Sequence, residues 1–379
     1  MIRVLMVVGT LNCGGAESLI MNLFRRIDRS KIVFDFAVND DGAGGFFDKE
    51  VLELGGRIYH FPKYRIYNGH KFKKTWKKFF EQHKNEYQII HTHHSSSVAI
   101  ILKIAKKYGL YTVAHSHSAG WDKSLKGLGN RMLSHKTRKV ADYFLACSYN
   151  AGVTEFGKKV CDDESRFRIV ANGIESGKYQ FDVETRNKIR KQLNIPSDVH
   201  VYGHVGRFSY PKNHQYLLKI FAEINKKEPT SYMLLCGDGE LRPQIMSQIK
   251  ELHLEDKVIL AGVVNNIHEY LQAMDYFIFP SNYEGLPLSV VEAEAAGLKC
   301  LISDVITDEV KITDLVEYYS IKEEPIKWAE KVLSQVNYVR ENKIPEIISH
   351  GFDVENSVKF LTEFYLRIIE KRNSSGGQD

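Results

Sequence analysis

Short apolar runs rich in β-branched and aromatic residues alternate along this chain with longer segments of helical periodicity. In the first half the apolar runs lie at Val4–Val8, Ile32–Val38, Ile89–His91, Leu110–Ala114, Tyr143–Ala146 and Phe167–Val170. Helical patterns separate them, for example at Ala16–Ile27 and Ser96–Tyr108. Strand–helix alternation of this kind predicts a parallel sheet with helices on both faces.

The same alternation restarts after the polar stretch Asn172–Arg186. The second set of apolar runs lies at Val199–Val205, Tyr232–Cys236, Val258–Leu260, Tyr276–Phe279 and Cys300–Ile302. We therefore expect an α/β protein with two Rossmann-like, doubly wound parallel-sheet domains, residues 1–178 and 179–354, that face a cleft. The helical pattern over about 355–372 either ends the second domain or packs back on the first. Ligands of such sheets bind beyond the carboxyl ends of the strands.

Charge is distributed unevenly between the two halves. Residues 1–180 carry 29 Lys and Arg against 17 Asp and Glu, whereas residues 181–379 carry 23 against 30. The halves therefore have net charges of +12 and −7, which suggests that they have different partners. The five widely spaced cysteines include no C-x-x-C pair, which favours a reducing compartment and excludes a zinc ribbon.

No run of 18 apolar residues is present, so we expect no membrane-spanning helix. The opening residues MIRVLMVVGTLNCGG contain too short an apolar stretch for a signal peptide and predict a buried first strand. The expected location is the cytoplasm.

Glycine-containing loops follow several predicted strands. Gly14 and Gly15 stand between the first strand and the first helix, where the backbone and a helix N-terminus can approach an anion. A tight turn without a ligand is the alternative, and the dinucleotide fingerprint G-x-G-x-x-G is absent. Gly237 and Gly239 bracket Asp238 after another strand, where a simple turn and a ligand contact are equally favoured.

Two cations follow the first strand of the second half, in GHVGRFSYPKN at residues 203–213. Arg207 offers a planar fork and Lys212 a point charge, so together they can hold a diphosphate at the strand end, close to Gly206. A solvated pair of surface cations is the less favoured reading.

A strand-to-helix turn in PSNYEGLPLSVVEAEAAG, residues 280–297, carries two glutamates. Pro287 suits the first helical position, and early helical amides such as those of Leu288 and Ser289 can bind phosphate oxygens. Glu292 can accept hydrogen bonds from both hydroxyls of a ribose, and Glu284 would lie nearer the reacting group. The alternative makes both glutamates surface residues.

Histidines gather in HTHH, residues 91–94, and in AHSH, residues 114–117. Such a cluster can bind zinc, but no carboxylate or cysteine joins it at a suitable spacing. Hydrogen bonding to a polar substrate, or packing, is therefore favoured.

The segment KFKKTWKKFFEQH, residues 71–83, predicts a helix with an aromatic face formed by Phe72, Trp76, Phe79 and Phe80 and with five lysines on much of the remainder. Such a helix can lie on anionic lipid. Packing of its aromatic face on the sheet, with solvated lysines, is slightly favoured.

As a set, these motifs resemble the retaining, nucleotide-sugar-dependent glycosyltransferases of family 4, which have the GT-B fold. The resemblance runs from GTLNCGGAE to EGLPLSVVEAEAAG and rests on the E-x7-E spacing with Gly-Leu-Pro, the G-R-x4-K segment and VANGIE at 170–175. Within the family the chain looks most like bacterial enzymes of exopolysaccharide or capsule assembly. UDP is the favoured nucleotide by family frequency alone.

The resemblance implies a role for each matching residue. Gly15 approaches the donor diphosphate, Arg207 and Lys212 neutralise the leaving nucleotide, Glu292 binds the ribose and Glu284 binds the transferred sugar. His117 or His115 contacts that sugar from the first domain, and the backbone near Val263 meets the base. The implied set of catalytic residues is Arg207, Lys212, Glu284, His117 and His115, and the implied substrate-binding set is Gly14, Gly15, Asn172, Gly206, Gly237, Gly239, Val263, Gly285, Leu286, Leu288, Ser289 and Glu292.

No D-x-D motif is present to hold a cation on the diphosphate, so we expect no metal and no cofactor beyond the nucleotide-sugar substrate. The resemblance implies front-side attack with retention. The basic first half suggests a saccharide or polyprenyl-diphosphate-linked acceptor and peripheral contact with the anionic inner face of the membrane.

Three other functions compete with this interpretation: a non-catalytic sensor of sugar nucleotides, a sugar-nucleotide epimerase of similar architecture, and a nucleic-acid binder. The first is disfavoured by the presence of Arg207, Lys212, Glu284 and Glu292 together. The last lacks a dedicated motif, so no nucleic-acid partner is expected.

Overall fold

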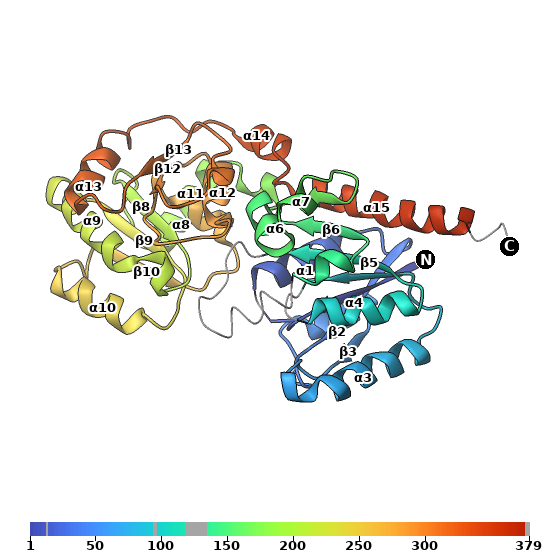
Figure 1. Cartoon of the computed structure of the whole chain (residues 1–379). Coiled ribbons are helices and arrows are strands. Elements are labelled where there is room, and N and C mark those ends of the chain that lie inside the picture. Colours follow the sequence, from blue (N-terminus) through green and yellow to red (C-terminus); the bar gives the residue numbers. More distant parts are fainter. Residues whose placement is uncertain (13, 94–96, 118–134, 376–379) are drawn as a thin grey trace. The chain divides into compact units, whose positions relative to one another are not determined.

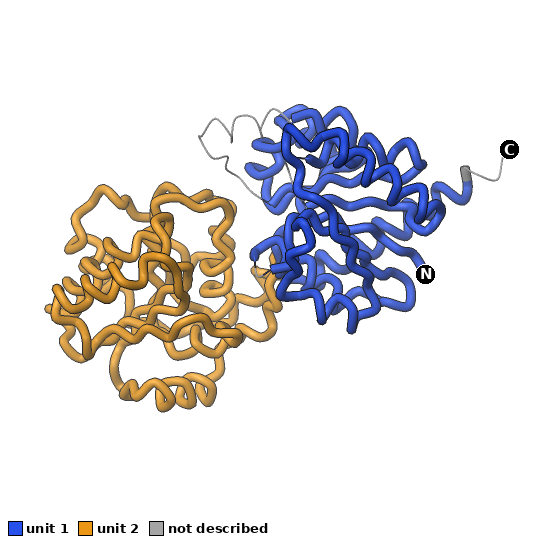
Figure 2. The backbone as a smooth tube through the Cα atoms, turned by 90° about the horizontal axis from the view of Figure 1, so that it is seen from below, with its two compact units in different colours: residues 1–173, 354–379 blue, residues 174–353 orange. Residues whose placement is uncertain are grey.

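A computed structural model describes residues 1–12, 14–93, 97–117 and 135–375 of the chain. It divides into two compact units, each formed around its own parallel sheet (Figures 1 and 2). Unit 1 consists of Met1–Gly173 and Val354–Asp379, and unit 2 of Ile174–Asp353. The boundary thus lies a few residues before the predicted position, and the last helix belongs to the first unit.

The sheet of unit 1 has seven strands in the order β3-β2-β1-β4-β5-β6-β7, all parallel. Its strands are β1 (Ile2–Val8), β2 (Ile32–Val38), β3 (Ile58–His60), β4 (Ile89–Thr92), β5 (Tyr111–Ser116), β6 (Tyr143–Ala146) and β7 (Phe167–Ile169). The helices are α1 (Gly15–Arg26), α2 (Asp48–Glu53), α3 (Gly69–Gln82), α4 (Val98–Lys107), α6 (Tyr149–Phe156), α7 (Lys158–Cys161) and α15 (Val354–Ser375), with short 3-10 turns η1 (Ile66–Asn68) and η2 (Thr137–Lys139).

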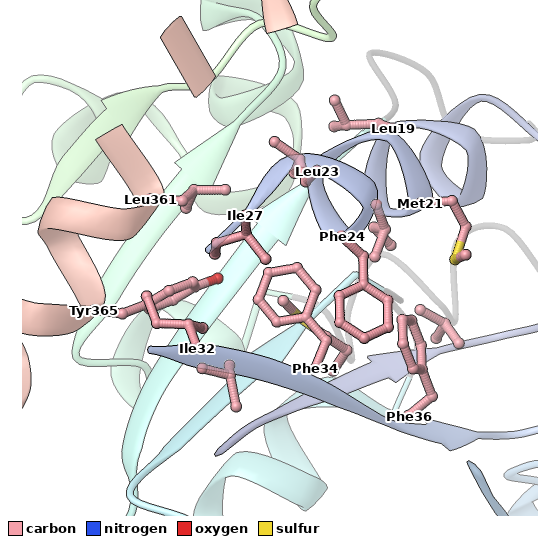
Figure 3. Packing of buried hydrophobic residues seen from close by; sticks show 14 of the residues in the cluster. Leu19, Met21, Leu23, Phe24, Ile27, Ile32, Phe34, Phe36, Leu361 and Tyr365 are labelled. Carbon is pink, nitrogen blue, oxygen red and sulfur yellow. The ribbon is translucent and has the colours of Figure 1, made fainter. Parts of the chain in front are cut away.

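One face of this sheet is covered by α1 and α15. Phe24 of α1 stacks on Phe34 of β2 with ring centroids 5.2 Å apart, and Tyr365 of α15 meets the edge of Phe34 at 6.2 Å (Figure 3). All three side chains are fully buried. Close packing of this kind holds the C-terminal helix to unit 1, although more than 300 residues separate it from β2 in sequence.

The opposite face is covered by α3 and α4. Trp76 of α3 stacks on Phe61 at 3.9 Å between ring centroids, and Phe72, Phe79 and Phe80 are buried beside it. The five lysines of α3 are exposed. The aromatic face of this helix is therefore part of the core and is not available to lipid, as the favoured interpretation of the sequence predicts.

The sheet of unit 2 has six parallel strands in the order β10-β9-β8-β11-β12-β13. They are β8 (Val201–Val205), β9 (Tyr232–Cys236), β10 (Val258–Gly262), β11 (Tyr276–Phe279), β12 (Lys299–Ser303) and β13 (Val316–Tyr319). The other elements are α8 (Val183–Gln192), α9 (His214–Lys227), α10 (Arg242–Glu251), α11 (Ile267–Ala273), α12 (Leu288–Ala295), α13 (Pro325–Leu333) and α14 (Ile344–Ser349), with η3 (Ser176–Tyr179), η4 (Tyr210–Lys212) and η5 (Asp308–Val310). These two parallel sheets confirm the predicted α/β class.

Two strands, β3 and β13, were not predicted from the sequence. Each lies at the edge of its sheet and pairs with a single neighbour. Their residues are mostly half-buried, because an edge strand is covered less completely than a central one. The apolar run that marks a central parallel strand is therefore weak there. None of the helices in the described part of the chain has the length and the apolar character needed to span a bilayer.

Candidate active site

The loops that follow β8 and β11 leave the sheet of unit 2 side by side. Strand β8 lies between β9 and β11, so the direction of strand order reverses there, and ligand sites of doubly wound sheets form at such a point. Two hydrogen bonds join the loops. The Asn282 amide donates to the Pro211 carbonyl at 2.7 Å, and Asn213 Nδ2 donates to the Pro280 carbonyl at 3.0 Å. The motifs at residues 203–213 and 280–297, which are separate in sequence, thus lie side by side at one edge of the sheet of unit 2.

Lys212 and Glu284 meet across these loops. The Lys212 ammonium lies 2.8 Å from Glu284 Oε1, and it also lies over the Phe279 ring, 4.6 Å from its centroid. Both charged side chains are largely enclosed, with 17% and 13% of their surface exposed. Asn213, in the left-handed conformation at φ 54°, turns the chain from η4 into α9 directly after Lys212. Contacts with Glu284 and Phe279 therefore fix the position of the Lys212 ammonium.

Arg207 has a different environment. Its guanidinium is 74% exposed and lies 3.0 Å from Glu240, which is itself 55% exposed. An exposed pair of this kind contributes only about 0–1 kcal/mol, so little free energy opposes a change of partner. The structure thus brings Lys212 and Glu284 together but pairs Arg207 with Glu240.

Helix α12 begins immediately after the loop that holds Glu284. Pro287 precedes its first residue, and the loop residues Gly285 and Leu286 are exposed and half-exposed. The first amides of a helix, here those of Leu288 and Ser289, have no intrahelical acceptor and lie at the positive end of the helix dipole. This end of α12 therefore offers an anion backbone donors next to the Lys212–Glu284 pair.

Glu292 lies one turn further along α12 and is partly buried. The hydroxyl of Tyr179, from η3, donates a hydrogen bond of 2.8 Å to its Oε1. Desolvation raises the pKa of Glu292 to about 7, although the bond from Tyr179 acts in the opposite direction. Burial and the carboxylate raise the pKa of Tyr179 far above its ordinary value. Glu292 is thus a carboxyl group that changes charge near neutral pH.

The glycines of the loop after β9 have a packing role. Gly237 has a φ of 142°, and a Cβ atom there would lie 2.1 Å from the carbonyl oxygen of Gly206. A Cβ atom on Gly239 would lie 2.5 Å from the carbonyl oxygen of Phe208. The loop after β9 therefore packs directly against the loop that carries Arg207. Val263, after β10, is 78% exposed at the same sheet edge.

In unit 1 the strand order reverses between β1 and β4. Gly14 and Gly15 follow β1 and begin α1, and a Cβ atom on Gly15 would meet no atom within 4 Å. Packing therefore does not explain this glycine. Asn172, which follows β7, is buried, and its side chain raises the pKa of His117 against the larger, opposite effect of burial.

Four histidines lie together at the ends of β4 and β5. His93 Nδ1 lies 2.8 Å from His117 Nε2, and His91 Nδ1 lies 2.6 Å from the hydroxyl of Tyr365. His115 is 5% exposed, whereas His93 and His117 are half-buried. Desolvation holds the pKa values of His91, His93 and His115 well below 6.5 and lowers that of His117 to about 4. His94 lies outside the described residues.

Comparison with known proteins identifies the chain. Residues 13–177 match the family described as Glycosyltransferase Family 4, and residues 185–337 match Glycosyl transferases group 1. The chain is 32% identical over 379 residues to EpsF of Bacillus subtilis, a protein assigned as a glycosyltransferase, with 97% of each chain covered. The chain belongs to glycosyltransferase family 4.

Other relatives agree with this placement. The family 4 chain is 26% identical to the Escherichia coli enzyme UDP-Gal:alpha-D-GlcNAc-diphosphoundecaprenol alpha-1,3-galactosyltransferase, over 76% of this chain and 77% of that one. The crystal structure of Anabaena HepE in complex with UDP matches with a TM-score of 0.78 at 18% identity, covering 97% of this chain and 100% of that one. The fold is therefore GT-B, as predicted, and the protein is a glycosyltransferase.

Three residues at these sites of the glycosyltransferase were not predicted from the sequence. Tyr179 contacts Glu292, Asn213 ties the two loops of unit 2 together, and Tyr365 contacts His91. An asparagine directly after Y-P-K is a signal for the left-handed turn at Asn213. The two tyrosines carry no local signal, because their partners are more than 100 residues away.

Proposed function

We propose that this glycosyltransferase transfers a sugar, with retention, from a UDP-sugar to a saccharide or lipid-linked acceptor in the synthesis of a surface polysaccharide. One observation carries the proposal: the Lys212–Glu284 pair, the N-terminus of α12 and Glu292 lie along one edge of the sheet of unit 2. They offer a cation and backbone donors for the diphosphate and a carboxylate for the ribose. The UDP bound in HepE supports the choice of nucleotide.

In the proposed reaction the bond between the anomeric carbon and the diphosphate oxygen breaks, and negative charge builds on that oxygen. Lys212 and the amides of Leu288 and Ser289 stabilise this charge, so no metal ion on the diphosphate is needed. Arg207 exchanges Glu240 for the phosphate, since its present ion pair is weak. The acceptor hydroxyl attacks the same face of the sugar and passes its proton to the leaving oxygen, which gives retention.

Other residues orient the donor in this proposal. Glu292 accepts hydrogen bonds from the ribose hydroxyls, and Glu284 binds the transferred sugar while its other oxygen holds Lys212. Of the two candidate histidines, His117 is the more exposed, which favours it over His115 as the ring that contacts the sugar. The residue Val263 is 78% exposed, and in this proposal its backbone contacts the base.

The decisive experiment measures release of UDP from a panel of UDP-sugars, with and without lipid-linked and free saccharide acceptors. We expect release that depends on the acceptor and continues with EDTA present. We also expect its loss in the double variant Arg207→Ala with Lys212→Ala. The matched control is Arg242→Ala with Lys219→Ala, which removes the same charges from α10 and α9. Near-normal transfer by the first double variant would refute the diphosphate assignment, and conversion of a UDP-sugar without any acceptor would indicate an epimerase.

We further propose that unit 1 contacts the anionic inner face of the membrane, where a polyprenyl-diphosphate acceptor resides. The lysines of α3 are exposed, and the preceding turn η1 presents Ile66 and Tyr67, which are 91% and 82% exposed. Cations beside exposed apolar side chains favour an anionic lipid surface. The substrate named for the Escherichia coli relative, a diphosphoundecaprenol-linked sugar, supports a lipid-linked acceptor.

Cosedimentation with vesicles that contain phosphatidylglycerol tests this contact. The test variant replaces Lys71, Lys73, Lys74, Lys77 and Lys78 by Gln, and the control replaces the exposed lysines Lys49, Lys103, Lys107, Lys158 and Lys159. We expect the first variant alone to lose binding. Equal binding by both variants would exclude α3 as the contact.

A further inference from the structure

We propose that His91, His93 and His115 of unit 1 form a binding site for one first-row transition-metal ion such as Zn²⁺. One ligand nitrogen from each ring lies within 4.8 Å of those of the other two. Three neutral imidazoles are a common ligand set for such an ion, and they leave a fourth position for water or an oxygen ligand. The site departs from our sequence-based expectation of no metal.

The register of two neighbouring strands creates the cluster. His91 and His93 are two residues apart at the end of β4, so their side chains project from the same face of the sheet. Thr92 of β4 pairs with Ala114 of β5, which places the next residues, His93 and His115, beside each other. The ring centroids of His91 and His115 are 5.3 Å apart, and those of His93 and His115 are 5.2 Å apart. The third ligand, His115, thus comes from the adjacent strand β5, which local sequence spacing does not show.

Within the described part of the chain, each ring of the cluster has at least one nitrogen that is free of a protein partner. Among the described residues, buried His91 Nε2, His93 Nε2 and both nitrogens of His115 have no hydrogen-bond partner. Leaving one such buried polar atom unsatisfied costs about 1–3 kcal/mol, so a bound ion that contacts all three rings would stabilise the cluster. An ion supplies one partner for all three rings at once.

The other nitrogens of the cluster are already occupied. Tyr365 binds His91 at Nδ1, and His117 binds His93 at Nδ1. When each of these Nδ1 atoms donates its proton to that partner, the Nε2 atom keeps a lone pair for a metal. Partners that fix the tautomer and the ring orientation in this way are typical of histidine metal sites. Tyr365 and His117 are thus positioning residues for the ion.

The distances require only a small adjustment. Three nitrogens at the corners of a triangle with 4.8 Å sides lie ~2.8 Å from its centre, and zinc–imidazole bonds are ~2.0–2.1 Å. A four-coordinate ion lies outside the plane of the three nitrogens and needs them ~3.3 Å apart, so each nitrogen has to move by at most ~0.8 Å, which is within the reach of a side-chain rotation. Because His115 is assigned to the ion, His117 remains as the histidine available to a sugar. The assignment of His117 to the sugar rests on the proposed function, whereas the proposed metal site does not.

Zinc and cobalt binding to the untagged, chelator-stripped full chain test the site. Competition with a chromophoric chelator should show one tight zinc site, and one equivalent of Co²⁺ should give the visible absorption of a four-coordinate ion. We expect His91→Gln and His115→Gln to weaken zinc binding by at least ~100-fold. Tyr365→Phe, which keeps the buried ring, should weaken it by ~10-fold. The control His83→Gln changes a histidine of α3's C-terminal cap and should bind zinc like wild type.

X-ray absorption of the zinc-loaded wild-type protein should show three imidazole ligands, and this measurement stands even if a cluster variant fails to fold. Zinc that binds folded His91→Gln and His115→Gln as tightly as wild type would overturn the proposal. So would a wild-type chain that takes up no stoichiometric zinc or cobalt. Because neither readout uses the transferase reaction, failure of the metal site and failure of the proposed function can be told apart.

Discussion

The charge of Glu292 should control the affinity for the donor nucleotide in the neutral pH range. Its pKa is about 7, because burial disfavours the carboxylate more than the bond from Tyr179 favours it. The ionised fraction is then ~10% at pH 6 and ~90% at pH 8. If only the carboxylate binds the ribose hydroxyls, affinity should increase by ~10-fold, or ~1.4 kcal/mol, from pH 6 to pH 8.

UDP-glucose is a suitable probe, because both of its phosphates are esterified and neither titrates between pH 6 and pH 8. Calorimetric titration at constant ionic strength should show the ~10-fold increase for wild type. Glu292→Gln should bind with weak, nearly constant affinity over this range. Glu292→Ala should weaken binding by at least ~1.5–3 kcal/mol at pH 8, since a single hydrogen bond to a charged group contributes that much. The control Glu251→Gln, an exposed residue at the end of α10, should match wild type.

Tyr179→Phe provides an internal check on the cause. The variant lacks the hydroxyl group that donates a hydrogen bond to the carboxylate, so the pKa of Glu292 should rise. The pH dependence of UDP-glucose affinity should then move to higher pH. A wild-type affinity that is constant between pH 6 and pH 8 would refute the reasoning. An increase that Glu292→Gln retains would refute it as well, since another group would then be titrating.

Two further predictions concern glycines and a second buried carboxyl group. Gly237→Ala should lower the free energy of unfolding by about 2 kcal/mol or more in urea denaturation. Gly15→Ala should have a free energy of unfolding within ~0.5 kcal/mol of wild type but bind UDP-glucose more weakly. Equal stability of the two variants would contradict the packing argument. Glu294 is fully buried, accepts two 2.7 Å hydrogen bonds from Thr313 and has its pKa raised from 4.5 to about 8 by desolvation. Since the folded pKa is the higher one, its stabilising contribution is complete below pH 4.5 and is lost as the pH rises through 8, by about 5 kcal/mol in total. Glu294→Gln should remove this pH dependence of stability, and an unchanged slope would assign it to other groups.

The central strands of both sheets follow from the sequence because each is buried on two faces. In Ile32–Val38 every residue is buried and only Asp35, which pairs with Arg3, is polar, so composition marks such a run. Edge strands escape this constraint: β3 is only three residues long, and its last residue, His60, is exposed. The position of α15 could not be derived either. Its apolar face fits any sheet, and only the packing of Tyr365 and its neighbours on β2 decides which one it covers.

The strand-end motifs of the candidate site were visible because each lies within a short segment. The approach of Lys212 to Glu284 depends on the order of strands in the sheet, which local patterns do not specify. The exposed pairing of Arg207 with Glu240 was not visible at all, since the two residues sit in different loops. Likewise, HTHH and AHSH were evident as separate motifs, whereas their contact follows from the register of β4 and β5.

The link between Tyr179 and Glu292 shows why a residue without a motif can control a site. The chain enters unit 2 at Ile174 and leaves it at Asp353, and these two segments are tied together: the Ile174 amide donates to the Phe352 carbonyl at 2.8 Å, and the Ser176 amide donates to Asp353 at 3.3 Å. The turn that follows carries Tyr179 to α12. The residue that lowers the pKa of the proposed ribose ligand is therefore held by the segment through which the chain enters the unit. Tyr179 reaches Glu292 because of where the chain enters unit 2, and it does not lie at the end of a strand. Only the three-dimensional structure therefore reveals this contact.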